Sequence, residues 1–157
     1  MNSIPKNKKP FKARLQYLHL VLPLLVSTLL VACGARITAY TGTCAEQTQQ
    51  FMDHVHSLAR DELMPLINDG FNAGATPELM KRIEELNTRI SQLSTPECNP
   101  RTQAVKEALL LYMAETKNYF MIVAGRAVYG EGPVQAQRIK MNEAGLAFEI
   151  ALEDVRK

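Results

Sequence analysis

Residues 76–93 read TPELMKRIEELNTRISQL, and this stretch decides the expected fold. Its large apolar side chains recur at alternating steps of four and three residues, at Leu79, Ile83, Leu86, Ile90 and Leu93. This spacing places them in one line along a helix, which is the pattern of a helix that packs against other helices. Thr76 and Pro77 are residue types that favour a helix start. The stretch therefore predicts an amphipathic helix within a helical domain.

The chain on either side of this helix carries three more segments with helical spacing. Residues 44–68 have apolar side chains mostly at steps of three and four, and Pro65 is expected to kink or end that helix. Residues 68–75, NDGFNAGA, are rich in turn formers and predict a loop. Two further helices are expected, one at 99–129 and one from 133 to near the C-terminus.

The spacing also predicts which faces of the last two helices are buried. On the helix at 99–129 the expected stripe is Ala104, Ala108, Leu111 and Ile122, widened by Val105, Leu109, Tyr112, Tyr119 and Val123. On the last helix one stripe is Val134, Ile139, Leu146 and Ile150, and an adjacent one is Phe148, Leu152 and Val155. No run of alternating apolar and polar residues follows position 44, so a sheet is not expected. Short links favour antiparallel neighbours, and we expect residues 44–157 to form an all-α, antiparallel up-down-up-down four-helix bundle.

A different pattern precedes this domain. Residues 1–14 carry positive charges only, and the apolar run Leu15–Ala32 follows, as in a secretory signal peptide. The run ends in Leu30-Val31-Ala32-Cys33, which resembles the bacterial lipobox. The resemblance implies that residues 1–32 are a lipoprotein signal peptide removed before Cys33, whose thiol then carries diacylglycerol and whose amino group can be acylated, for example with palmitate. The alternative is an uncleaved signal anchor in which Cys33 occurs by chance.

The lipobox resemblance also implies where the protein resides. Two or three acyl chains hold a protein stably on a membrane, so Cys33 would anchor it on the extracytoplasmic side of the cell envelope through a short tether, 33–43. Gly34 follows the cysteine, whereas an Asp at that position commonly favours inner-membrane retention in Gram-negative lipoproteins. We therefore expect the outer membrane if the cell has one, and otherwise the outer face of the cell membrane.

The two remaining cysteines are expected to pair. In an up-down arrangement the start of the first helix and the end of the second lie at the same end of the bundle, which brings Cys44 near Cys98. An extracytoplasmic chain permits the bond. The alternative is two free thiols.

The sequence offers little for catalysis, metals or nucleic acid. Asp53-His54-Val55-His56 resembles a ligand cluster, but side chains two apart on a helix point about 200° from each other, so we expect exposed histidines on either side of a buried Val55. No nucleophile elbow, phosphate loop or dinucleotide motif occurs. After position 33 thirteen basic and sixteen acidic residues remain, so no nucleic-acid footprint exists. We expect no enzyme activity, cofactor or metal site.

Two groups of residues remain as weaker candidates for a functional surface. Either Glu115 or Arg126 could reach inward and form a buried pair with the last helix, where Glu143 interrupts the apolar stripe, or both could lie at the edges of the packed faces with their charges in water. The helix at 99–129 also carries an aromatic bias, which is typical either of the core or of a protein interface: Tyr112, Tyr119, Phe120 and Tyr129.

Residues 95–123 and 144–152 resemble, in outline, uncharacterised bacterial lipoproteins and secreted helical domains. The likeness rests on Pro96 and Cys98 in a turn, on Leu111-Tyr112-Met113 and on a last helix containing Phe148. It implies no defined activity. We therefore expect a non-enzymatic binding or accessory module that contacts another envelope protein, and the alternative is a bundle that holds a small apolar molecule or a metal.

Overall fold

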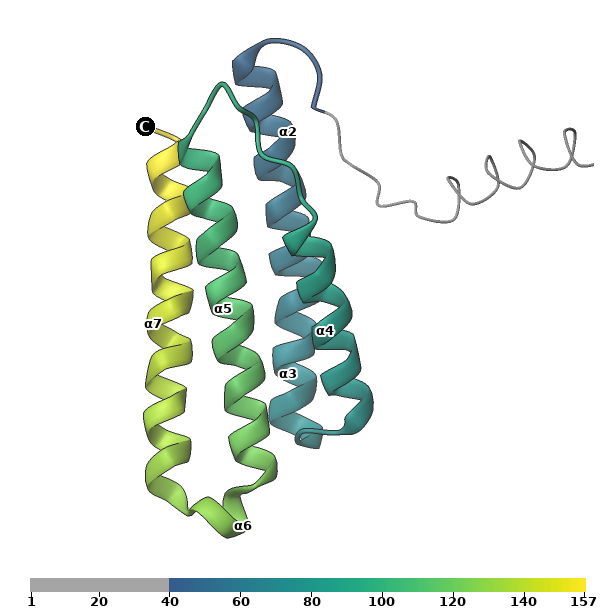
Figure 1. The fold of residues 1–157 in the computed structure, drawn as a ribbon, viewed down its shortest axis with the longest axis vertical. Helices are drawn as coiled ribbons and strands as arrows, with labels where there is room; N and C mark the ends of the chain where they lie inside the picture. Colours follow the sequence, from purple (N-terminus) through teal and green to yellow (C-terminus); the bar gives the residue numbers. More distant parts are fainter. Residues whose placement is uncertain (1–39) are drawn as a thin grey trace, which may run out of the picture. The chain divides into compact units, whose positions relative to one another are not determined.

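The computed structural model describes residues 40–157, and every described element is helical (Figure 1). The elements in order are α2 (Cys44–Ser57), η1 (Leu58–Leu63), α3 (Met64–Ala73), α4 (Pro77–Ser91), α5 (Arg101–Ala124), α6 (Arg126–Tyr129) and α7 (Glu131–Val155). The described part of the chain contains no strand, as the sequence predicts. Within it, no helix is both long enough and apolar enough to cross a membrane.

Helix α4 follows the sequence pattern closely. Thr76 caps its start by accepting a hydrogen bond from the backbone N–H of Leu79 at 3.1 Å, and Pro77 is its first residue. All five apolar residues of the predicted line are buried: Leu79, Ile83, Leu86, Ile90 and Leu93. This helix packs against α3, η1 and α5.

The predicted loop at 68–75 is wrong, because α3 continues as helix to Ala73. A π-helical turn, η1, precedes Pro65, and in it the N–H of Met64 bonds the carbonyl of Ala59, five residues back. A π turn changes which side chains face inward. Pro65 then lies in the first turn of α3, where a missing N–H costs little. Pro65 therefore does not end the helical segment.

Gly70 explains part of how α3 packs. A Cβ at this position would lie 2.3 Å from the ring of Phe120 in α5, far closer than carbon atoms approach. The buried faces of α3 and α5 therefore meet at a glycine, inside a helix where glycine is otherwise unfavourable. The same region contains Phe71, whose ring centroid lies 5.6 Å from that of Tyr119 and 5.8 Å from that of Phe120.

Helices α5 and α7 lie side by side, with α6 at the turn between them (Figure 1). The predicted stripe of α5 is partly wrong, since Ala104 and Leu111 are exposed. The buried residues of α5 are Thr102, Val105, Leu109, Met113, Thr116, Tyr119 and Phe120. Its inward face therefore includes two threonines that the apolar pattern does not mark.

Of the two stripes predicted for α7, the first is wrong at three of its four positions. Ile139, Leu146 and Ile150 are exposed, and Val134 alone of that stripe is buried. The adjacent stripe is confirmed at Phe148 and Leu152, and Val155 is half-buried. The buried face consists of Val134, Gln137, Met141, Ala144, Phe148 and Leu152. It includes small residues that let α5 approach closely, because a Cβ at Gly145 would lie 3.3 Å from the Tyr112 ring.

Candidate functional site: the disulfide end and the exposed helix faces

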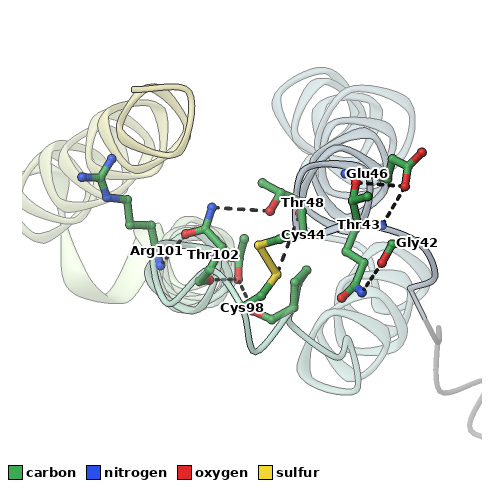
Figure 2. Close-up of a disulfide and its surroundings, with 11 residues drawn as sticks. Gly42, Thr43, Cys44, Glu46, Thr48, Cys98, Arg101 and Thr102 are labelled. Carbon is green, nitrogen blue, oxygen red and sulfur yellow. Dashed lines mark hydrogen bonds between the residues drawn. A yellow bond between two sulfur atoms is a disulfide. The ribbon is translucent and has the colours of Figure 1, made fainter.

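A disulfide joins Cys44 at the start of α2 to Cys98 in the link between α4 and α5 (Figure 2). The Cα atoms lie 5.8 Å apart, within the range that this bond requires. Both cysteines are exposed, and the Cys98 Sγ lies 3.8 Å from the Cys44 carbonyl oxygen. The structure thus holds the cysteine pair that the topology predicts, and it places the bond at the solvent surface.

The residues just before Cys44 fold back along the first turns of α2. The backbone N–H of Thr43 donates to Glu46 Oε2 at 2.7 Å, and the N–H of Glu46 donates to Thr43 Oγ1 at 3.3 Å, which makes a capping box (Figure 2). The Glu46 carboxylate accepts hydrogen bonds from the backbone N–H and from the hydroxyl of Thr43, and these two bonds lower its pKa. The ring of Tyr40 packs edge-on against Phe51 at 6.0 Å. The last part of the predicted tether, residues 40–43, is therefore attached to the helical domain.

The link between α4 and α5 is held by its own hydrogen bonds. The hydroxyl of Thr102, which is fully buried, donates to the Asn99 carbonyl at 2.6 Å. Asn99 Oδ1 accepts from the N–H of Arg101 at 3.1 Å, and Lys106 Nζ donates to the Leu93 carbonyl at 2.6 Å. This network fixes the turn that carries Cys98. The Asn99-Pro100 pair predicts the helix start from the sequence. The burial of Thr102 could not be predicted from the apolar pattern, because threonine is a polar residue.

The two histidines of α2 lie on either side of Val55. Val55 is fully buried, as predicted, whereas His54 and His56 are half-buried and not exposed as expected. His56 Nε2 lies 3.0 Å from a guanidinium nitrogen of Arg156. Among residues 40–157, no group of three His, Cys, Asp or Glu side chains could hold a metal ion.

The charged residues singled out in the sequence, Glu115, Arg126 and Glu143, lie in three different helices. Gln137 of α7, which is buried, donates its amide to the carboxylate of Glu115, so a polar contact does cross between these helices. Arg126 instead pairs at the surface with Glu131, and Glu143 is exposed. Glu115 therefore makes an inward contact with the last helix, but through Gln137 and not Glu143, whereas Arg126 does not reach inward.

The aromatic residues of α5 divide between core and surface. Tyr119 and Phe120 are buried, Tyr112 is half-buried, and Tyr129 lies exposed in α6. Burial raises the pKa of the Tyr112 hydroxyl, and the nearby charge of Glu149 raises it further. No continuous aromatic surface results, although Tyr129 and its neighbour Val128, which is 84% exposed, project from the α6 turn.

An open groove of about 490 Å³ runs between α4 and α5. Its lining is mixed, with Met113 and Met121 beside Asn87 and Asn118, and an ion pair between Lys117 Nζ and Glu84 Oε1 at 2.6 Å borders it. A drug-sized ligand site is usually mostly apolar and enclosed. This groove is open and has a mixed polar and apolar lining, so it does not resemble such a site.

The apolar face of α7 is the most extended candidate surface. Ile139, Leu146 and Ile150 are 52%, 62% and 56% exposed, although they follow helical spacing. The sequence pattern predicts that these three residues are buried, whereas the structure places them on the surface.

Comparisons with protein-family models, with curated proteins and with solved structures found no match. The predicted lipidation site, Cys33, and the predicted signal peptide, 1–32, lie outside the described residues.

Proposed function

We propose that this protein is an extracytoplasmic lipoprotein, anchored through lipid on Cys33, whose helical domain is a non-enzymatic binding module of the cell envelope. The observation that carries the proposal is the exposed Cys44–Cys98 disulfide. A solvent-accessible disulfide persists in an oxidising compartment and is rare in the cytosol. Cys44 lies eleven positions after the lipobox cysteine, Cys33, so the disulfide and the lipid anchor both indicate the extracytoplasmic side of the membrane.

The domain is best described as an antiparallel up-down-up-down four-helix bundle of α2 with α3, α4, α5 and α7. Ion pairs between successive helices support this arrangement. Arg82 of α4 pairs with Asp69 of α3, and a later residue of α4, Arg89, pairs with the earlier Glu62 of η1. Such reversed order is expected of neighbours that run in opposite directions.

The same reversed order recurs in the other helix pairs. Between α4 and α5, Lys117 contacts Glu84, and Lys106 contacts the carbonyl of the later Leu93. At the start of α5, Arg101 donates to the carbonyl of Asp154 near the end of α7 at 2.8 Å. These contacts favour one bundle over residues 44–157. The tether (33–43) and the signal peptide (1–32) are proposed from the lipobox resemblance alone.

Exposed apolar side chains favour a binding role. Val128 and Tyr129 at the α6 turn, and the face of α7, have no partner within the described residues to cover them. The alternative, a bundle that holds a small apolar molecule or metal, requires an enclosed apolar cavity or a ligand cluster. The mixed lining of the α4–α5 groove does not favour it.

The lipid anchor is tested by Cys33→Ser in cells labelled with a palmitate analogue. We expect the variant to lose the label and to leave the membrane fraction. Cys98→Ser is the matched control, because it removes a thiol from the folded domain and should keep both label and membrane retention. Equal labelling of Cys33→Ser and the unchanged protein would exclude the lipoprotein proposal.

The binding role is tested by in-cell crosslinking. A photo-crosslinking amino acid at position 128 should capture one dominant envelope protein, identified by mass spectrometry, and the yield should fall in the Cys33→Ser background. The same probe at position 81, an exposed site on α4, is the control. A pattern at 128 no different from that at 81 would contradict a docking role for the α6 turn.

A further inference from the structure

The outward face of α7 combines apolar side chains with an ordered set of charges. At 100° per residue, Ile139, Leu146 and Ile150 project within about 40° of one another, and buried Met141 and Phe148 project from the other side of the helix. We call these three exposed residues the α7 stripe. The packing of α7 against α5 does not require them to be apolar.

The charges beside the α7 stripe change sign along the helix. Arg138 and Lys140 are exposed in its first half, and Glu149 and Glu153 are exposed in its second half. A helix dipole favours the opposite order, with acidic residues near the start and basic residues near the end. Glu131 in the first turn of α7 follows this rule, whereas the last turn has no basic residue and contains Glu153, so the position of Glu153 is not explained by the dipole of α7.

This order is self-complementary when two such helices run antiparallel. We propose that the α7 stripe is the contact surface for a second copy of this chain, with the two α7 helices antiparallel about a twofold axis. Placing Ile139 opposite Ile150 of the second copy sets Arg138 at the level of Glu149 and Glu153 of that copy, on the same side of the contact. A parallel pair would instead place like charges together.

The size of the surface sets the expected strength of this contact. Helix α7 has 25 residues, which gives a length of about 37 Å and a contact strip of about 400 Å². Stable interfaces bury about 800 Å² per partner. In addition, the twofold axis of this register passes between positions 144 and 145, so the exposed Glu143 residues of the two copies lie near each other and their like charges weaken the contact. We therefore expect a reversible dimer with a dissociation constant in the micromolar range or weaker.

Charge reversal provides a direct test. The full chain, purified in detergent with micelles in large excess, is labelled separately with donor and acceptor dyes, and self-association is measured by energy transfer against protein concentration. Arg138→Glu alone, and Glu149→Arg with Glu153→Arg, should each weaken self-association by about 10-fold, because attraction becomes repulsion at two symmetric contacts. Mixing the two variants should restore affinity to about that of the unchanged protein, because both contacts in the mixed dimer are again attractive.

Controls separate this effect from a change in folding. All three positions are exposed, so helicity and melting temperature should stay as in the unchanged protein. Lys81→Glu on α4 is the matched charge reversal and should not alter association. A mixture that binds no better than the separate variants would overturn the proposal. An unchanged protein that shows no concentration-dependent energy transfer would also overturn it. This holds even if Leu146→Gln abolishes capture of another envelope protein, because the α7 stripe would then bind that protein and not a second copy.

Discussion

The disulfide should account for a large share of the stability of the helical domain. Its two cysteines are 54 positions apart, and closing a loop of that length removes about 14 cal/mol/K of entropy from the unfolded chain, or about 4 kcal/mol at 25 °C. Unfolding a domain of about 120 residues has an entropy near 0.25 kcal/mol/K. Replacing both cysteines, in Cys44→Ser with Cys98→Ser, should therefore lower the melting temperature by about 15 °C.

The assay is thermal unfolding followed by circular dichroism at 222 nm. Helicity at 25 °C should be unchanged, because the hydrogen bonds of Asn99 and Thr102 that hold the α4–α5 turn do not involve sulfur. The unchanged protein under a reducing agent should melt with the double variant, and Ala45→Ser, an exposed neighbour, should melt with the oxidised protein. A decrease of less than about 3 °C in the double variant would refute the loop-closure argument.

Three further changes test individual contacts. Gly70→Ala should destabilise the domain by about 1–3 kcal/mol in urea unfolding, because the added Cβ would meet the Phe120 ring; an unchanged midpoint would contradict the close approach. Thr116→Val should stabilise it by about 1 kcal/mol, because the buried hydroxyl has no hydrogen-bond partner, and a loss of stability would show that it has one. Glu46→Gln should lower stability at pH 7, and the difference should fade as pH falls through the lowered pKa of Glu46, whose charged form accepts from Thr43; a difference that persists in acid would refute this role.

Residues 76–93 show where sequence reasoning succeeds. Helix α4 has a single apolar line bounded by a capping threonine and a proline, so only one face can be buried. The Cys44–Cys98 pair follows from the same reasoning, because helix order alone brings the two positions to one end. The lipidation site depends on a motif outside the described residues and stays a prediction.

Helix α7 shows why the buried face can be assigned wrongly. It carries two apolar stripes, and hydrophobicity alone favours the one containing Leu146. The close approach of α5 at Gly145, and the satisfaction of Gln137 by Glu115, select the other stripe. Both depend on packing between helices, which a single helix pattern does not contain.

The loop predicted at 68–75 fails for a related reason. Turn-forming residue types such as Gly70 indicate a loop when they are considered locally. Here the π turn at Leu58–Leu63 directs α3 so that a glycine is required against Phe120. In the sequence alone, a glycine required for close helix packing cannot be distinguished from a glycine required for a turn.

The position of the disulfide also determines how the domain would respond to mechanical force. A pull between the chain before Tyr40 and the C-terminus first loads the contacts of residues 40–43, and at Cys44 it passes through the covalent bond directly to Cys98. The chain between them, which contains α2, α3 and α4, bears no tension until the bond is reduced. At about 3.5 Å per residue, reduction would release about 190 Å of extra length. The bond thus makes the extensibility of the protein depend on the redox state of its surroundings.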